Sequence, residues 1–340
     1  MISPSNHPTQ PVLTTSDSGA HLAEKQQRSF SAMATQVNLL AFSDRATKQS
    51  VEDALKSVEE LFHAVEARCS RFLPTSELSI LNAAPEQKAQ LSTITFSMIS
   101  EAFRAYRMTN GAFDPRVLSD LVRLGYDRSF STLTLVSADP NPELRTSKES
   151  RPPLPPWNPV LDAESSTVVV GDHPLDLGGI GKGLAVRMSA EIIGRSTPSF
   201  LIEAGGDCYL SSRPLDDTAW KVGIEDPRSP ERHVAVLGLV DEGCATSSTR
   251  VRCWDHGGRS EHHLIDPRTG LPGGDGLTSV TVVEEDPAIA EVWSKTLFLS
   301  GELSIESEAE ARGLAAFWVF SNGRYQFSIK MGEKVIWLST

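Results

Sequence analysis

The sequence predicts an α+β protein whose sheets are mixed or antiparallel. Strand-like and helix-like segments both occur, but they do not alternate strictly, as they would in a doubly wound parallel sheet. The closing segment carries Asn322-Gly323, a dipeptide typical of the tight turn between antiparallel strands. With 340 residues, the chain is long enough for one large domain or two modest ones.

The first part of the chain is expected to contain a tail, a strand and a long helix. Residues 1–28 are polar and rich in Ser, Thr and Pro, and we expect them to form a disordered tail ahead of one domain spanning residues 29–340. A strand follows over residues 30–43. The helix is predicted to begin at a capping box formed by Ser50 and Asp53. Apolar residues then recur at helical spacing at Val51, Leu55, Val58, Phe62 and Val65.

The remaining elements surround a glycine-rich loop near the middle of the chain. A second helix is expected over residues 98–111, and residues 137–158, rich in proline and charge, are expected to form an exposed insertion. A strand over residues 166–179 leads into the loop, and a helix over residues 183–195 follows it. Further strands are expected at residues 199–212, 220–228, 277–286, 314–329 and 334–340, with a helix at 288–301.

Composition excludes several classes of function. The formal net charge is −12 and no run rich in lysine or arginine offsets it, which argues against nucleic-acid binding. The first residues contain no apolar segment of a secretory signal, and no window approaches the roughly 18 consecutive apolar residues of a membrane span. We therefore expect a cytoplasmic protein without a membrane span.

The four cysteines are scattered along the chain. They form neither a C-x-x-C pair nor the spacing of a zinc site. Free thiols are expected, and a disulfide between Cys244 and Cys253 stays open as an alternative.

The glycine-rich stretch LDLGGIGKG, Leu175 to Gly183, is the first candidate binding site. It fails the P-loop pattern, because Asp176 stands where the first glycine is required and Gly183 stands where the metal-binding hydroxyl is required. It also lacks the spacing of the dinucleotide pattern G-x-G-x-x-G. A strand in front and a helix behind leave backbone N–H groups and Lys182 free to hold a pyrophosphate. A tight turn that needs glycine only for its geometry is the alternative.

The segment HHLIDPRTGLPG, His262 to Gly273, holds the second candidate site. An unperturbed imidazole titrates near pH ~6.5, which suits His263 to accept a hydroxyl proton near neutral pH. A structural histidine is the alternative. Three further segments hold polar residues with weaker signals, for which turn and capping roles are the alternative: Arg71, Glu77, Asn82, Asp114 and Asp207.

The order of these segments resembles the ApbE family, the FAD:protein FMN transferases. Over about residues 29–330 the family's segments follow one another at matching spacings, as MATQV, SRFLPTSELSILN, GAFDPRV, LDLGGIGKG, IEAGGDCYL, VGIEDP, ATSS and HHLIDPRTG. The stretches DLGGIGKG and HHLIDPRTG are the most specific parts of this resemblance.

The resemblance implies a flavin site in a crevice between two lobes. Enzymes of this family cleave the pyrophosphate of FAD and attach FMN through a phosphoester to a Ser or Thr hydroxyl of a target protein, releasing AMP. His263 and Lys182 are then the catalytic candidates, with His263 as the base. Two alternatives stay open, namely hydrolysis of FAD to FMN and AMP, and binding of FAD without catalysis. The positions that match flavin contacts are Met33, Phe72, Ala112, Phe113, Asp114, Asp176, Lys182 and Ile265.

The metal site is where the sequence departs from the family. The resemblance implies Mg²⁺, held by a backbone carbonyl that matches Gly179 and by an Asp and a Thr that match Glu291 and Lys295. A protonated lysine repels a cation, so Lys295 is a doubtful ligand. On a helix, Glu291 and Lys295 can form an i, i+4 pair. We hypothesise that Lys295 replaces part of the metal's charge and that Arg187 adds to it; the alternative is that Glu291 or Ser294 still holds Mg²⁺.

Overall fold

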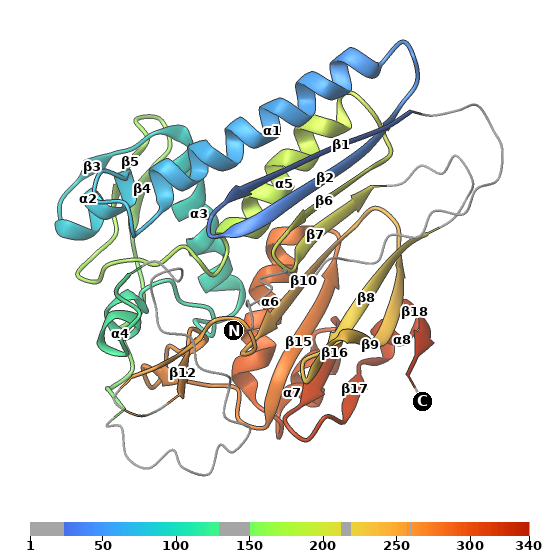
Figure 1. The fold of residues 1–340 in the computed structure, drawn as a ribbon. Helices are drawn as coiled ribbons and strands as arrows, with labels where there is room; N and C mark the ends of the chain where they lie inside the picture. Colours follow the sequence, from blue (N-terminus) through green and yellow to red (C-terminus); the bar gives the residue numbers. More distant parts are fainter. Residues whose placement is uncertain (1–23, 129–149, 212–218, 257, 259, 340) are drawn as a thin grey trace, which may run out of the picture.

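The computed structural model describes residues 24–128, 150–211, 219–256, 258 and 260–339. An eight-stranded sheet forms the centre of the molecule (Figure 1), and all neighbouring strands in it are antiparallel. The predicted α+β class with antiparallel sheets is confirmed. In spatial order the strands are β1 (Glu24–Ala32), β2 (Thr35–Ser43), β6 (Phe200–Ala204), β7 (Asp207–Ser211), β10 (Glu242–Ser248), β15 (Leu277–Glu284), β16 (Ala315–Phe320) and β17 (Tyr325–Phe327).

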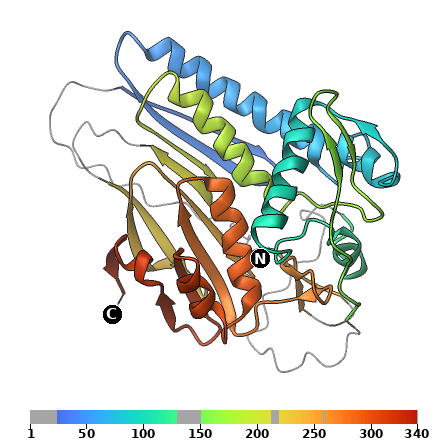
Figure 2. The same cartoon turned by 180° about the vertical axis from the view of Figure 1, so that it is seen from behind.

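Three helices cover one face of this sheet, namely α1 (Lys48–Cys69), α5 (Gly181–Gly194) and α6 (Pro287–Ser300). Figure 2 shows them side by side in front of the sheet, in blue, yellow-green and orange, and α5 contacts both of the others. The buried side of α1 consists of the apolar residues predicted from helical spacing together with Ala54. The helices predicted around the glycine-rich loop and near residue 290 are confirmed within two residues at each end.

A small sheet covers the opposite face. It consists of β8 (Trp220–Asp226), β9 (Ser229–Leu239) and β18 (Val335–Leu338), in the order β18–β9–β8. Apolar side chains from both sheets form one buried core between the layers. The hairpin of β16 and β17 around Asn322-Gly323 is confirmed, but the last strand, β18, pairs with β9 and does not extend that hairpin.

A smaller lobe lies beside the helical layer, at the left of Figure 1. Its core shares one buried cluster with side chains of α1, α5 and α6. The lobe contains three helices, α2 (Glu77–Ala83), α3 (Thr93–Met108) and α4 (Leu118–Arg123). It also contains a small sheet of β3 (Ala89–Gln90), β5 (Thr167–Val169) and β4 (Val160–Asp162), and two hairpins, β11 (Cys253–Asp255) with β12 (Ser260–His262) and β13 (Ile265–Asp266) with β14 (Leu271–Pro272).

Two further short helices, α7 (Ile305–Ala311) and α8 (Ile329–Gly332), belong to the C-terminal part of the chain.

The N-terminal strand begins earlier than the sequence predicts. Residues 24–28, assigned to the polar tail, are the first half of β1 and pair with β2. Their polar character hides the strand because β1 lies at the sheet edge and exposes most of these side chains, while Gln26 is buried and donates to the Ser43 hydroxyl at 2.6 Å. The strand predicted over residues 30–43 is in fact a hairpin, whose turn residues Met33 and Ala34 have φ of 55° and 56°.

The predicted capping box at Ser50 and Asp53 is wrong, because α1 begins at Lys48. A reciprocal pair of hydrogen bonds lies just ahead of the helix instead. The Thr47 N–H donates to the Asp44 carboxylate at 2.8 Å, and the Asp44 N–H donates to the Thr47 hydroxyl at 3.1 Å. Within the helix, Ser50 donates its hydroxyl to the Thr47 carbonyl. The reciprocal pair closes the turn that precedes α1.

In the part of the proline-rich segment that the structure describes, residues 150–158, most residues are exposed, as predicted, but Trp157 is buried. Residues 137–149 of the predicted insertion lie outside the described residues. Trp157 is only 3% exposed, its indole N–H donates to the Val170 carbonyl at 2.8 Å, and its ring packs edge-on against Phe103 and Tyr106. An indole is large enough to anchor a polar, proline-rich segment in the core of the smaller lobe.

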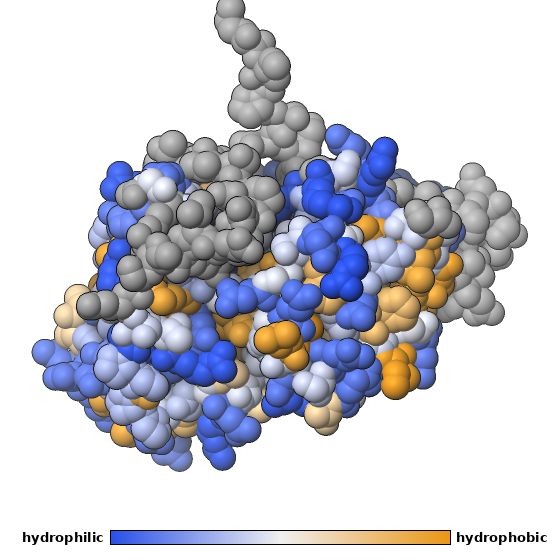
Figure 3. Space-filling view, turned by 90° about the horizontal axis from the view of Figure 1, so that it is seen from below, coloured by the Kyte–Doolittle hydropathy of each residue, from blue (hydrophilic) through white to orange (hydrophobic). Residues whose placement is uncertain are grey.

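All four cysteines are free, and Cys244 lies opposite Cys208 across β7 and β10, so it is not bonded to Cys253. Among the described residues, no helix is both long and apolar enough to cross a membrane. On the face seen in Figure 3, apolar residues form small groups separated by polar ones.

Candidate active site

A pocket collects side chains that lie far apart in the sequence. Its wall is formed by the β1–β2 turn, the end of α1, the loop before α4, the glycine-rich loop with the first turn of α5, the segment around β13 and one side of α6. All eight positions matched to flavin contacts line it, together with Gly179, His263 and Lys295. Glu291 does not line the pocket: its carboxylate is wholly buried and contacts Lys182 from behind the wall.

Hydrogen bonds from neighbouring segments fix the glycine-rich loop. The Asn82 side chain donates to the Leu175 carbonyl and accepts from the Leu175 N–H, both at 2.8 Å. Asp176 donates its N–H to the Pro115 carbonyl at 2.7 Å, and its carboxylate accepts the Gly178 N–H at 2.7 Å. Asn82, for which the sequence favours a turn role, therefore positions the loop that precedes α5.

The first turn of α5 presents backbone N–H groups at the pocket. The N-cap residue Ile180 gives no side-chain hydrogen bond to this helix, and the N–H groups of Gly179 and Lys182 have no acceptor among the residues that the structure describes. Gly183 lies so close to α6 that a Cβ on it would be 2.7 Å from the Ala288 Cα, which accounts for glycine at this position. The positive end of the helix dipole and free N–H groups together favour an anion here.

A buried charge network lies beneath this turn. The Lys182 ammonium contacts the Asp207 carboxylate and donates to Glu291 Oε1 at 2.7 Å. Glu291 Oε1 also accepts from the Lys295 ammonium at 3.1 Å, and Oε2 accepts the Gly183 N–H at 2.8 Å. The predicted i, i+4 pair of Glu291 and Lys295 is confirmed.

The network sets the protonation states of its members. Burial raises the pKa of Glu291, but the ammonium groups of Lys182 and Lys295 outweigh it and lower that pKa to about 2. Burial lowers the pKa of Lys182, and the carboxylates of Asp207 and Glu291 reverse this and raise it. For Asp207, burial and the Glu291 charge raise the pKa to about 6, although Lys182 opposes them. At neutral pH Lys182 and Glu291 are therefore both charged.

These residues do not fit a divalent metal ion. Both oxygens of Glu291 already accept hydrogen bonds, and the Ser294 hydroxyl points to the Glu291 carbonyl and to Ser247, away from the pocket wall. The described residues contain no group of three His, Cys, Asp or Glu side chains placed to hold a metal. A divalent cation about 4 Å from one ammonium would be repelled by about 8 kcal/mol at an effective dielectric constant of about 20. The expected Mg²⁺ thus has no ligand set among the described residues.

His263 lines the pocket in its neutral form. Burial lowers its pKa well below the usual 6.5, and the positive charges of Arg252 and Lys295 lower it further. Its Nδ1 lies 3.3 Å from the Arg252 carbonyl oxygen. Because a carbonyl oxygen only accepts, Nδ1 carries the hydrogen and Nε2 is left as the basic nitrogen.

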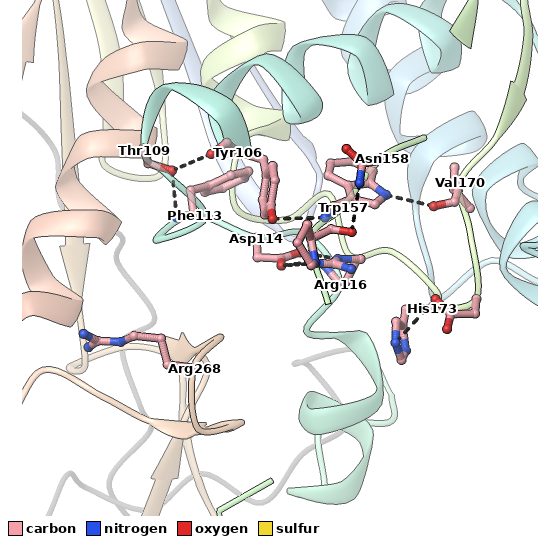
Figure 4. Close-up of polar contacts among 12 residues, drawn as sticks. Tyr106, Thr109, Phe113, Asp114, Arg116, Trp157, Asn158, Val170, His173 and Arg268 are labelled. Atoms are coloured by element: carbon pink, nitrogen blue, oxygen red, sulfur yellow. Dashed lines mark hydrogen bonds and ion pairs between the residues drawn. The ribbon is translucent and has the colours of Figure 1, made fainter. Parts of the chain in front are cut away.

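The residues around Phe113 are held by a second set of contacts, shown in Figure 4. The Thr109 hydroxyl accepts the Phe113 N–H at 2.9 Å, which places the Phe113 ring in the pocket wall. Asp114 forms a bidentate pair with Arg116, with contacts of 3.0 and 2.7 Å. Both oxygens of the Asp114 carboxylate therefore accept hydrogen bonds from Arg116, and Asp114 contributes to the pocket as part of its wall.

Arg71 is better placed than its sequence signal suggests. Its guanidinium lies 4.1 Å from the Phe72 ring and 4.5 Å from the Tyr126 ring, and its Nε contacts the Asp176 carboxylate at 2.6 Å. Nη1 donates to the Tyr126 carbonyl, whereas the buried Nη2 has no hydrogen-bond partner among the described residues. A buried, unpartnered N–H in a pocket wall is a donor for a ligand.

The fold also decides the places of two other arginines, Arg187 and Arg252. Arg187 does not line the pocket and instead pairs with Glu101 and Asp286 on the other side of α5, so the prediction that it adds charge to the metal position is wrong. Arg252 does line the pocket, yet no motif marks it. Only the fold, which brings β11 beside His263, identifies it.

Fold and site together define a class of protein. A pocket whose wall combines aromatic and apolar side chains with two lysines, a neutral histidine and the start of α5 suits a ligand with a ring system and phosphate groups. The comparisons with known proteins agree. This chain belongs to the ApbE family, whose sequence model matches residues 33–318.

Individual relatives resemble the chain over most of its length. The FAD:protein FMN transferase of Haemophilus influenzae is 26% identical over 294 residues, covering 84% of each chain. The one from Vibrio cholerae is 25% identical and covers 77% of this chain and 78% of the relative. Among solved structures, the ApbE protein of Thermotoga maritima aligns with a TM-score of 0.76 at 23% identity, over 92% of this chain and 99% of the other. The flavin transferase ApbE from Vibrio cholerae aligns with a TM-score of 0.72 at 24% identity, over 92% and 100%.

Proposed function

We propose that this chain is an FAD:protein FMN transferase, which moves FMN from FAD to a Ser or Thr hydroxyl of a target protein. One observation carries the proposal: a pocket wall that contains both a buried lysine network at a helix start and a group of apolar and aromatic side chains, including Met33, Phe72 and Phe113. The activity named for the relatives supports it.

The two parts of FAD match the two parts of the wall. The isoalloxazine ring packs against the apolar group, where Ala112 and Ile265 add to the surface. The diphosphate lies at the start of α5, where the Lys182 ammonium and the N–H groups of Gly179 and Lys182 neutralise it. Arg71 Nη2 donates to an acceptor of the flavin half, and its pair with Asp176 keeps the guanidinium in place.

The transfer step follows from this placement. The acceptor hydroxyl oxygen bonds to the phosphorus of the FMN half, while the bond from that phosphorus to the bridging oxygen of AMP breaks and AMP leaves with its electron pair. Nε2 of His263 takes the hydroxyl proton, a role typically worth a factor of about 10²–10⁴ in rate. The Lys182 ammonium stabilises the charge on the phosphate oxygens throughout.

The test is the appearance of a covalent flavin. The purified chain is incubated with FAD and an extract of the cells that produce it, the proteins are denatured on a gel, and flavin fluorescence that survives denaturation is followed by mass spectrometry of the modified residue. We expect fluorescence on a Ser or Thr of a partner protein, with AMP released in equal amount. Heat-denatured enzyme serves as the blank.

The variant His263→Ala separates catalysis from binding. We expect at least about a 10²-fold loss of transfer with FAD affinity changed by no more than a few-fold. Free FMN and AMP without an adduct would identify a hydrolase instead. Unchanged FAD bound to the folded protein would identify a binding protein without catalysis.

A further inference from the structure

The charged groups at the glycine-rich loop leave one positive charge uncompensated. Four cations line the pocket wall; Arg71 is paired with Asp176, and the other three are Lys182, Lys295 and Arg252. Within the described part of the chain, only two carboxylates, Asp207 and Glu291, contact the lysines. In a chain whose net charge is −12, this local excess of positive charge marks a place for an anion.

Among these cations, Lys295 is held in place by a hydrogen bond and is also accessible from the pocket. Its ammonium donates to Glu291 Oε1 at 3.1 Å, and 17% of its side chain is exposed, in the pocket wall. Its Cδ and Cε lie 3.5 Å from the point where a Cβ on Gly179 would stand. The lysine stem therefore runs along the glycine-rich loop, and the ammonium reaches the same loop from α6.

The same hydrogen bonds occupy the oxygens that would bind a divalent ion. Each Glu291 oxygen is held, one by two ammonium groups and the other by the Gly183 N–H, and Ser294 faces β10. A cation could take Glu291 only by displacing a buried lysine, which would leave an unpaired charge in the protein interior. The lysine and the metal are alternatives at this position.

Building on the proposed function, we propose that the Lys295 ammonium supplies the positive charge beside the FAD diphosphate that a divalent cation would otherwise supply. FAD binding and FMN transfer by this chain then require no divalent metal. Burial lowers the pKa of Lys295, and the Glu291 carboxylate opposes this. An ammonium has three donors, so it can hydrogen-bond phosphate oxygens and the Glu291 carboxylate together.

The wild-type chain gives the first test. FAD affinity, by quenching of flavin fluorescence, and AMP release are measured in excess EDTA and again with added Mg²⁺. We expect both quantities to agree within about two-fold. A loss of AMP release in EDTA that Mg²⁺ restores would overturn the inference and leave FMN transfer standing. If the folded chain neither binds nor cleaves FAD in either buffer, the proposed function fails and the inference fails with it.

Variants at position 295 give the second test. Lys295→Met keeps the apolar stem and removes the charge, and we expect at least a 10-fold loss of AMP release that Mg²⁺ does not restore. Lys295→Arg keeps the charge and should lose less. Lys295→Asp places two carboxylates at i, i+4, so we expect activity that EDTA abolishes and Mg²⁺ restores.

A matched control is available on α1. Lys56 and Glu60 also form an i, i+4 pair, at 3.8 Å, but both side chains are about two-thirds exposed and neither residue lines the pocket. Lys56→Met should leave AMP release unchanged. Wild-type rates in folded Lys295→Met would overturn the inference.

Discussion

His263 owes its basic form to the residues around it. Burial, the positive charges of Arg252 and Lys295, and the neighbouring His262 all lower its pKa well below 6.5. A histidine with a depressed pKa stays neutral as pH falls and takes up a proton only below its usual titration range. The base proposed for the transfer step is therefore available at neutral and mildly acidic pH.

This property predicts the pH dependence of transfer. Because kcat/KM reports the free enzyme, we expect it to be constant from about pH 8 to 6.5 and to fall only at lower pH. The bound diphosphate is negative and raises the pKa of His263, so the acid limb of kcat should lie at higher pH than that of kcat/KM. Steady-state rates of AMP release across pH 5–8 check both limbs. An acid limb of kcat/KM centred at or above about 6.5 would contradict this account of His263.

Arg71 gives a second prediction at the scale of one residue. The variant Arg71→Lys keeps a positive charge beside Asp176 but removes the unpartnered Nη2 donor. A hydrogen bond to a charged donor is worth about 1.5–3 kcal/mol, so FAD affinity should fall at least about 10-fold. Calorimetric titration measures the affinity, and thermal unfolding verifies the fold. Equal affinity of variant and wild type would show that Nη2 does not contact FAD.

The sequence predicts individual residues best where their partners are close in the chain. Glu291 and Lys295 are four residues apart on a helix, and their pairing is confirmed. Arg187, by contrast, turns to Glu101 and Asp286, which are 86 and 99 residues away. The place of Arg252 in the pocket wall, and the hydrogen bonds of the Asn82 side chain to the Leu175 backbone, likewise depend on contacts that only the folded chain creates.

At the scale of elements, the crossing of α5 and α6 positions the charge network. Gly183 lets the two helices approach until their backbones meet, and its N–H donates to Glu291. Element types are predicted well along this region because apolar spacing and the glycine-rich loop mark them. Element boundaries are predicted less well: polar edge-strand residues conceal the first half of β1, and Asp44 with Thr47 close the turn ahead of α1.

The variant Gly183→Ala tests the crossing. A Cβ would lie 2.7 Å from the Ala288 Cα and 2.8 Å from the Pro287 carbonyl oxygen, neither of which can rotate away. We expect the free energy of unfolding to fall by about 1–3 kcal/mol, with weaker FAD binding as Glu291 shifts. Gly194→Ala, at the other end of α5, is the control, because its Cβ would be 3.8 Å from the Phe200 ring. It should be neutral or stabilising by up to about 1 kcal/mol, and denaturant unfolding that shows the same loss for both variants would refute the argument.

At the scale of the whole molecule, the large sheet with its helices and the smaller lobe meet at the pocket. The large sheet and its helices supply the lysine network and the start of α5, while the smaller lobe supplies Phe72, Phe113 and Arg71. The antiparallel class could be predicted from the order of elements. The closing pairing of β18 with β9 could not, because strand pairing between distant segments leaves no local pattern.

The central claim is that the lysine network and the start of α5 bind the diphosphate of FAD. Calorimetric titration of the wild-type chain with FAD and with riboflavin, both in EDTA, tests it most directly. Two charge-assisted hydrogen bonds of about 1.5–3 kcal/mol each predict that FAD binds at least about 100-fold more tightly than riboflavin. Equal affinity for the two ligands, or no uptake of FAD by the folded chain, would contradict the claim.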